Sequence, residues 1–367
     1  MLFFRPLPRH FFIRFAAALP SLLFIAAAMA FAACARADDY HLGEGYNVGP
    51  LNISGYSNLV AEMPNEGRSG FTLDDFSVFL SGRFNRWINP FVELELSGGQ
   101  VFTENGGFFE QGVPRIVLER AYNDFLLTPA WTFRVGKMLS PVGEWNQIHA
   151  APLVWTVNRP LTTHQNFSEF SSGVAVLYND PEGRLPEVQA YFQPVDDFIR
   201  EPRNVKPIQY RGVGGFNVAF TSDLHKRLGF SMQRAENSDT GEKQWLIGMD
   251  GRISFSALTL ETQWTRTWVS RPDDASPWLA KPSQQHPLRN EWGGYVQAIY
   301  GLDEHWNLVA RGETFQSRYA HDVSGNWLLG VVYRPQPAIS WKVEYLETSG
   351  VPLDLSRGLY ASMAVLF

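Results

Sequence analysis

The sequence predicts an all-β fold: one transmembrane antiparallel β-barrel of about sixteen strands, with short turns at one rim and long loops at the other. Three observations predict it. No apolar run after residue 38 approaches the ~20 residues that a membrane-spanning helix requires. The mean hydropathy is only −0.18, although 14% of the residues are aromatic. Segments of about ten residues alternate apolar and polar side chains, as strands with one lipid-facing and one wet face do.

The first 37 residues predict a cleaved signal peptide, which leaves residues 38–367 as the barrel domain. Three arginines between residues 5 and 14 form a basic start, residues 15–31 are apolar, and Ala35-Arg36-Ala37 offers a small-x-small cleavage site. Two alternatives stay open. The apolar stretch could be retained as an anchor. Cys34 could instead carry a lipid, although Phe31 stands where a lipidation motif prefers a branched aliphatic residue.

Charge and cysteine content exclude several function classes. The whole chain has a net charge of −6, and the leader holds four arginines and no acidic residue, so the remainder has −10. An acidic protein is a poor candidate for nucleic-acid binding. Cys34 is the only cysteine, and it lies in the leader, so thiol catalysis and zinc–thiolate sites are not expected in the remainder. No cofactor is expected.

The C-terminal segment shows the strand alternation most clearly. Leu359, Ala361, Met363, Val365 and Phe367 share one face, and polar or small residues share the other. The same period of two recurs in earlier segments, at 92–96, 188–192, 228–232, 245–249, 292–300, 306–310 and 339–345. Each such segment predicts one strand of the wall.

Glu93 and Glu95 indicate which face of the wall is wet. They alternate with the apolar residues Val92, Leu94 and Leu96. A charge that faces lipid near the bilayer midplane costs about 2–4 kcal/mol, so both carboxylates are expected to face the lumen.

The connections alternate in length, as in outer-membrane barrels with short periplasmic turns and long extracellular loops. Short links are expected at 89–90, 128–129, 180–183, 223–225, 254–256, 303–304 and 335–337, and long ones near 98–114, 138–171, 194–211, 269–291 and 348–357. Rings beside the short links are interpreted as a periplasmic girdle: Trp87, Phe91, Trp131, Phe220, Trp306, Tyr333 and Trp341. The alternative is that these rings form the core of a soluble β-sandwich.

One segment does not fit a simple alternation. Glu119 and Arg120 are adjacent charges, and neighbouring residues of a regular strand point to opposite faces. One of them is therefore expected near a rim or at a β-bulge, where an extra residue interrupts the alternation.

Several stretches and the last residue carry a family resemblance. They are Phe71-Thr72-Leu73-Asp74-Asp75-Phe76 with Leu80-Ser81-Gly82-Arg83, Leu118-Glu119-Arg120-Ala121-Tyr122, Arg134-Val135-Gly136-Lys137 with Pro141-Val142-Gly143-Glu144-Trp145-Asn146, and the terminal Phe367. These stretches resemble the phosphate-selective porin O and P group of bacterial outer-membrane porins. The resemblance implies a trimeric sixteen-stranded channel with a constriction loop folded into the pore. It also implies anion selectivity based on lumenal lysine and arginine ladders, whereas this chain is acidic and has no run of lysines.

Charged residues on the wet face are the candidate site of such a channel, because wall charge and pore width decide selectivity. The expected pore-lining residues are Asp75, Arg83, Glu93, Glu95, Arg134, Asp250, Arg252, Glu261, Arg311, Glu313, Lys342 and Glu344. Acids slightly outnumber bases in this set, which favours a weak cation preference or none. The expected function is passive diffusion of small hydrophilic solutes or ions, with anions such as phosphate implied by the resemblance. The alternative for any one residue is an ordinary solvated wall position.

Residues 138–171 are expected to form the constriction loop. The segment is far longer than a hairpin needs, and it is rich in Trp, Phe and Pro. So apolar a loop is expected to fold into the barrel; the alternatives are packing across the barrel mouth or at a subunit contact. Its candidate site residues are Glu144, Trp145, His149, Trp155, Arg159 and His164.

Two other functions stay open: a barrel enzyme that acts on lipid, and a lumen-blocked structural barrel. Ser140, Asn146, His149 and His164 lie near one another in the chain, but catalytic groups are recognised by geometry and not by spacing. No G-x-S-x-G or H-E-x-x-H motif is present, so an enzyme is not expected.

The expected location is the outer membrane, and the expected assembly is a homotrimer. The partners expected there are outer-membrane lipids and lipopolysaccharide, and the barrel-assembly machinery, which would engage the C-terminal strand that ends in Phe367.

Overall fold

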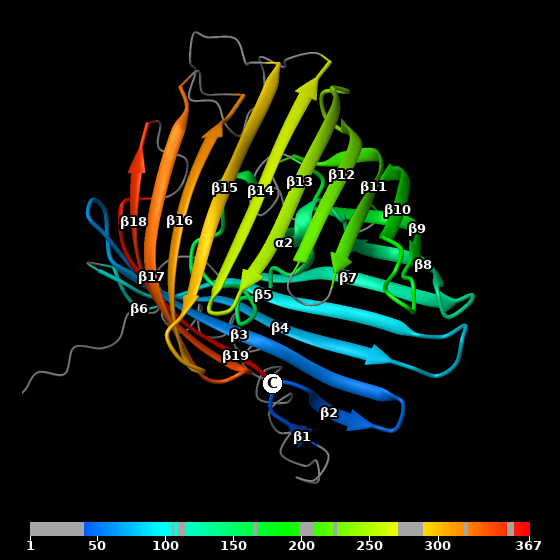
Figure 1. Ribbon diagram of the computed structural model, residues 1–367, viewed down its shortest axis with the longest axis horizontal. Helices are drawn as coiled ribbons and strands as arrows, with labels where there is room; N and C mark the ends of the chain where they lie inside the picture. Colours follow the sequence, from blue (N-terminus) through cyan, green and yellow to red (C-terminus); the bar gives the residue numbers. More distant parts are fainter. Residues whose placement is uncertain are drawn as a thin grey trace, which may run out of the picture.

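Sixteen long antiparallel strands form a closed barrel (Figure 1), which confirms the predicted fold class. The computed structural model describes residues 40–104, 106–108, 115–163, 167–197, 208–222, 226–270, 289–318, 322–350 and 356–367, so the predicted signal peptide lies outside the described residues. The barrel strands are β3 (Leu51–Pro64), β4 (Gly70–Gly82), β5 (Pro90–Thr103), β7 (Arg115–Leu126), β8 (Trp131–Leu139), β9 (Phe170–Tyr178), β10 (Glu187–Asp196), β11 (Tyr210–Ser222), β12 (Lys226–Asn237), β13 (Lys243–Phe255), β14 (Leu258–Val269), β15 (Asn290–Gly301), β16 (Trp306–Gln316), β17 (Ser324–Gln336), β18 (Ile339–Ser349) and β19 (Gly358–Leu366).

The ring closes where β19 pairs with β3, so each long strand has two antiparallel neighbours. Three further strands are short: β1 (Tyr40–His41), β2 (Gly45–Val48) and β6 (Gly107–Phe108). The helical segments α2 (Gly143–Gln147) and η2 (Leu161–Thr163) lie in the connection between β8 and β9. No helix in the described part of the chain is long and apolar enough to cross a membrane.

The two faces of the wall differ in the way that the alternation predicts. On β18, Val343 is 49% exposed on the outer face, whereas Lys342 and Glu344 on either side of it are each 2% exposed on the inner face. On β16, Leu308 points outward and Arg311 inward by the same rule. An apolar outside and a charged inside suit a barrel surrounded by lipid.

Asparagine and aspartate side chains stabilise the short turns. The carboxylate of Asp303 accepts a hydrogen bond of 2.7 Å from the backbone N–H of Trp306, and Asn85 Oδ1 accepts one of the same length from the N–H of Trp87. Such side chains imitate a backbone turn, which is why they mark turns in the sequence. The longer connections join the strands at their other ends, because consecutive antiparallel strands alternate in direction.

Two predicted loops are shorter than expected. β5 extends to Thr103, so residues 98–103 belong to the wall and not to a loop. The connection expected at 138–171 spans residues 140–169, because Leu139 pairs with Phe170 in the ladder between β8 and β9. Met138, Leu139 and Phe170 are as apolar as the loop beside them, so the sequence does not mark the ends of β8 and β9.

Phe91 does not belong to the aromatic girdle on the outside. Its ring stacks on Tyr122 with ring centroids 5.2 Å apart, and the guanidinium of Arg120 lies 4.7 Å from its centroid. Arg120 in turn pairs with Glu93, which has the same parity as Phe91. Phe91 therefore faces the lumen, and the parity of Glu93 already indicated this. Other predicted girdle rings, such as Trp306 and Trp341, are exposed on the outer face.

A β-bulge resolves the ambiguity at Glu119 and Arg120, as predicted. The register between β5 and β7 shifts there: Glu93 pairs with Arg120, Leu94 pairs with Leu118, and Glu119 is the extra residue. Both charges reach the interior, because Arg120 contacts Glu93 and Glu119 contacts His149 of the connection between β8 and β9. The bulge thus places two adjacent charges on one side of the wall.

The last residue of the chain seals the ring against Gly55. The Phe367 N–H donates to the Gly55 carbonyl at 2.9 Å, and the Gly55 N–H donates to the Phe367 carbonyl at 2.8 Å. The Phe367 ring stacks on Phe76, with centroids 5.5 Å apart. A Cβ on residue 55 would stand 2.1 Å from the Ser77 carbonyl oxygen and 2.9 Å from the Phe367 ring, so only glycine fits.

We expect Gly55→Ala to destabilise this seam by about 1–3 kcal/mol, the usual cost of overpacking a closed site. The measurement is the fraction of refolded protein that migrates as the compact, heat-modifiable barrel in a gel. Gly312→Ala is the matched control, because nothing lies within 4 Å of a Cβ at that strand position. Equal folding of the two variants would contradict this account of the seam.

Candidate functional site

The described residues of the connection between β8 and β9, 140–163 and 167–169, lie inside the barrel; we call this connection the lumen loop. Figure 1 shows its helix α2 behind β12 and β13. The Gly143 N–H donates to Ser231 Oγ of β12 at 3.1 Å, and Thr162 Oγ1 lies 2.6 Å from Thr265 Oγ1 of β14. The apolar residues of the loop pack on inward apolar side chains: Trp155 and Val157, for example, contact a cluster that includes Leu328, Leu346 and Tyr360.

Four charges on β16 and β18 hold the lumen loop; we call Arg311, Glu313, Lys342 and Glu344 the anchor residues. Glu344 accepts hydrogen bonds from the Val157 N–H and the Asn158 N–H, each 2.8 Å, and from Asn158 Nδ2 at 2.7 Å. Glu313 accepts one from the Leu161 N–H at 2.7 Å.

The two basic anchor residues bind carbonyl oxygens of the lumen loop. Lys342 Nζ donates to the Ala151 carbonyl at 2.6 Å, and Arg311 Nη1 donates to the Asn158 carbonyl at 2.9 Å. All four anchor residues were predicted to line the pore. They do face inward, but each of them bonds to the loop backbone and is at most 6% exposed.

A second group of charges surrounds the start of the loop; we call Glu144, Arg227, Asp250, Arg252 and Glu261 the Glu144 cluster. Arg252 Nη1 lies 3.0 Å from Glu144 Oε1, and Arg227 Nε donates to Asp250 at 3.1 Å. A cavity of about 80 Å³ is lined by Glu144, Arg252 and Glu261. A neighbouring hollow of about 800 Å³, which the exposed outer-face residues Phe220 and Val296 also line, shares Arg252 and Glu261 with it. These charges therefore border open space, unlike the anchor residues.

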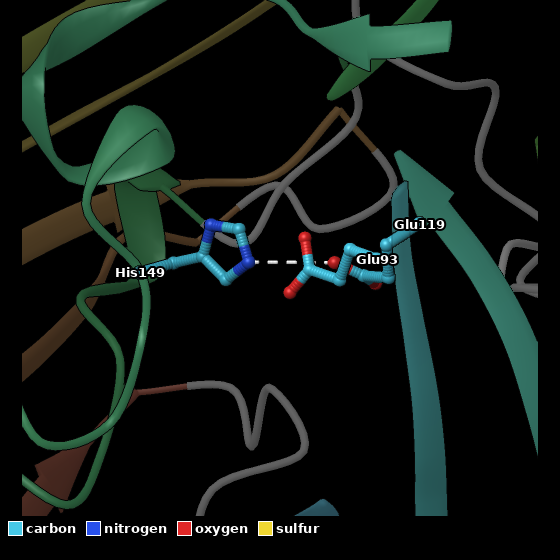
Figure 2. Close-up of side chains that lie close together, drawn as sticks. All are labelled: Glu93, Glu119 and His149. Atoms are coloured by element: carbon cyan, nitrogen blue, oxygen red, sulfur yellow. Dashed lines mark ion pairs between the residues drawn. The ribbon is translucent and has the colours of Figure 1, made fainter. Parts of the chain in front are cut away.

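A third group lies across the barrel, where β4, β5 and β7 face the lumen loop. Figure 2 shows His149 of the loop pointing toward Glu93 of β5 and Glu119 of β7. His149 Nε2 lies 3.4 Å from Glu119 Oε2. Arg159 pairs with Glu169 at 3.4 Å within the loop. Burial lowers the pKa of Arg159 to about 10, and the nearby carboxylates of Glu119 and Asp75 oppose that shift.

The remaining predicted site residues fall in three places. Glu95 lies on the inner face of β5, beside Glu93. Arg134 also faces inward, where it pairs with Asp124 at 2.7 Å. Arg83 is the correction: it follows the end of β4 in the short turn and is exposed, so it sits at the rim and not along the wall. The prediction placed Arg83 inside by extending the alternation of β4, but the chain changes direction at the turn and the alternation ends there. His164 lies outside the described residues.

The loop aromatics have structural contacts. Trp145 is 8% exposed, and its ring meets Tyr295 edge-on with centroids 6.5 Å apart. The Arg334 guanidinium stacks over Trp155 at 4.0 Å from the ring centroid. Both tryptophans therefore hold the loop against the wall.

The sequence interpretation missed Glu119, Arg120 and Arg227 as inward charges. Arg227 alternates with Leu228 and Phe230, so simple parity along β12 could have found it. Glu119 and Arg120 could not be assigned, because only the pairing register locates the extra residue of the bulge.

The sequence neighbours considered for catalysis do not form a nucleophile and base pair among the described residues. Ser140 is fully buried, whereas the two ring nitrogens of His149 face the Asn146 carbonyl at 3.2 Å and Glu119. Asn146 Nδ2 donates to the Ser140 carbonyl at 2.7 Å, which stabilises the loop backbone.

We expect the ion preference to move toward anions as the pH falls, through Glu144. Burial raises the pKa of Glu144 above its ordinary value, although Arg252 and Arg227 oppose the shift. Protonation therefore begins at a higher pH than for an exposed glutamate, and it leaves the two arginines with less negative charge beside them. The measurement is the reversal potential in a salt gradient at stepped pH. Glu144→Gln should remove this component, and an unchanged pH profile in that variant would contradict the assignment.

The geometry assigns the chain to one class of fold. It is a sixteen-stranded antiparallel barrel with one connection folded into the lumen, which is the porin-like fold of outer-membrane barrels. No protein-family model and no curated protein sequence matches the chain.

Solved structures share this fold. OmpF of Salmonella typhi, in complex with daunomycin, aligns with a TM-score of 0.63 and 12% identity over 88% of this chain and 99% of that one. The in-vitro folded trimer form of OmpT, an outer membrane protein of Vibrio cholerae, gives 0.59 and 10% over 88% and 100%. An anion-selective porin from Comamonas acidovorans gives 0.57 and 11% over 86% and 98%. At these identities the likeness concerns the fold.

Proposed function

We propose that the protein is an outer-membrane porin, a water-filled channel for passive diffusion of small hydrophilic solutes or ions. One observation carries the proposal: a closed barrel holds a loop in its lumen, and charges on loop and wall border the open space that remains. Such an arrangement selects solutes by pore width and wall charge, so no catalytic step is required.

Ion preference is the finer part of the proposal. In the Glu144 cluster, Glu144, Asp250 and Glu261 outnumber Arg227 and Arg252. This excess of acid favours a weak cation preference. The resemblance to the phosphate-selective porin O and P group favours anions instead, and the sign of the reversal potential decides between them.

The test is a planar-bilayer recording of the purified protein without its first 37 residues. Stable, stepwise conductance would support a channel, and a salt gradient would give its ion preference. Silence from a barrel that is folded and heat-modifiable would overturn the proposal and favour a lumen-blocked structural barrel. Hydrolysis of added phospholipid by the same preparation would favour the barrel-enzyme alternative.

Location and assembly belong to the same proposal. Export through a cleaved signal peptide, insertion through the barrel-assembly machinery by the strand that ends in Phe367, and contact with outer-membrane lipids and lipopolysaccharide are all expected of a porin. A homotrimer is expected too, and one structural neighbour is described as a trimer. Membrane fractionation and the molecular mass of the unheated protein in detergent test these points.

A further inference from the structure

Glu93, Glu119 and His149 form a compact group of metal-binding side chains between the wall and the lumen loop. The two glutamates come from the neighbouring strands β5 and β7, and the histidine comes from the loop (Figure 2). One ligand atom from each residue lies within 4.8 Å of the other two. The bulge in β7 creates the group, because it turns Glu119 inward next to Arg120.

A buried oxygen of Glu93 is the second observation. The Glu93 side chain is fully buried; its Oε2 accepts a hydrogen bond from Arg120, but its Oε1 has no hydrogen-bond partner among the described residues. A buried acceptor left in this state is destabilising, because it has lost its hydrogen bonds to water and gained none in the protein. A cation bound between Glu93 and His149 would satisfy it.

We propose that these three residues bind a divalent transition-metal ion of the zinc class. Imidazole nitrogen and carboxylate oxygen are both zinc ligands, at about 2.0–2.2 Å from the ion, and a site with three protein ligands keeps one position for water. Two such ligands in a tetrahedral arrangement stand about 3.4 Å apart. The observed 3.4 Å between His149 Nε2 and Glu119 Oε2 equals this spacing and is longer than an ordinary hydrogen bond.

The charged side chains around the group include more acids than bases, which favours a bound cation. Arg120 pairs with Glu93, and Arg159 faces Glu119, Asp75 and Glu169. Four carboxylates thus surround two guanidinium groups. A divalent ion would add positive charge to a group in which acidic side chains outnumber basic ones.

The bound ion would fasten the lumen loop to β5 and β7, a part of the wall separate from the anchor residues on β16 and β18. It would also add positive charge beside the pore, so it would shift ion preference toward anions. This consequence, unlike the binding itself, rests on the proposed channel function.

Cobalt binding to the purified, folded barrel in detergent tests the site directly. We expect the wild type to take up Co²⁺ with visible absorption bands, and Zn²⁺ to displace it. Removing a ligand, in His149→Ala or in Glu119→Gln, is expected to weaken binding by about tenfold or more. His305→Ala is the matched control, because His305 also lies beside a glutamate, at 3.6 Å, but at the exposed rim. Heat-modifiability shows that each variant is folded, and two ligand variants guard against a folding defect in one of them.

Equal Co²⁺ binding by the wild type and the folded ligand variants, or none by the wild type, would overturn the proposal and leave an ion pair that fastens the loop. A second arm records bilayer currents with and without micromolar Zn²⁺. A shift of the reversal potential toward anions in the wild type but not in His149→Ala supports the consequence for the channel. If Co²⁺ binds but the barrel conducts no current, the metal site stands and the channel function fails.

Discussion

Replacing Glu344 with alanine is expected to release the lumen loop from the wall and to raise the single-channel conductance. The Glu344 carboxylate accepts three hydrogen bonds from Val157 and Asn158, and it is 2% exposed. Its loss leaves buried donors without an acceptor and removes an acidic neighbour of Arg311 and Lys342, a change that costs about 3–5 kcal/mol in buried networks. Since 1.4 kcal/mol is tenfold in an equilibrium constant, the ratio of docked to undocked loop should fall by about a hundredfold or more.

Bilayer recording and limited proteolysis check this expectation together. A released loop should widen the channel, increase current noise and allow chymotrypsin to cut after Trp155. Glu344→Gln keeps an acceptor and should have a smaller effect. Glu236→Ala is the control: Glu236 pairs with Arg211 at the exposed end of β12, away from the lumen loop. If Glu344→Ala conducts and resists chymotrypsin like the wild type, the anchoring role is wrong.

Arg311→Glu should be the most destabilising single charge reversal in the wall. The Arg311 side chain is fully buried, bonds to Thr156 and Asn158 of the loop, and lies 3.5 Å from Glu313. A glutamate there would lie beside Glu313 and near Glu344, with Lys342 as the remaining cation of the group. Breaking a buried pair in this way costs about 3–5 kcal/mol, so we expect a lower yield of folded barrel and a detached loop, and not a simple change of ion preference.

Thermal unfolding of the heat-modifiable form measures the effect. Arg211→Glu is the matched control, because Arg211 also sits beside a glutamate but on the exposed surface, where such pairs contribute about 0–1 kcal/mol. Arg134→Glu should behave between the two, since Arg134 and Asp124 are about one-fifth exposed. An Arg311→Glu barrel as stable as Arg211→Glu would show that the loop does not depend on this residue.

The strand alternation predicted more than the fold class, because lipid imposes a strict rule on every outward position. Glu93, Asp250, Arg311 and Glu344 all face inward as their parity required. The same rule placed Phe91 inside, and the girdle interpretation was wrong there because it weighed proximity to a turn above parity.

Local departures from regular pairing could not be predicted in the same way. The bulge at Glu119 depends on which residue of β7 pairs with Leu94 of β5, and that choice is made by two strands together. Arg83 was expected on the wall but lies at the rim, because β4 ends at Gly82 and the alternation of faces stops where the strand ends.

The role of each inward charge depends on whether the lumen loop bonds to it. Sequence marks Arg311, Lys342 and Glu344 as wall charges, but it does not reveal that residues 151–161 will bind them. Arg252 and Glu261 look no different in the sequence, yet they border the cavities instead.

Local sequence patterns were enough to predict the barrel, its two faces and the segment that folds into the lumen. Strand period, turn residues and an apolar loop are properties of short stretches of chain, and their surroundings of lipid or water act on them directly. Tertiary structure alone decided which charges hold the loop, which border open space, and which meet at His149. Those outcomes depend on contacts between residues far apart in the chain, such as Asn158 with Glu344 and His149 with Glu119, and on distances that no local pattern encodes.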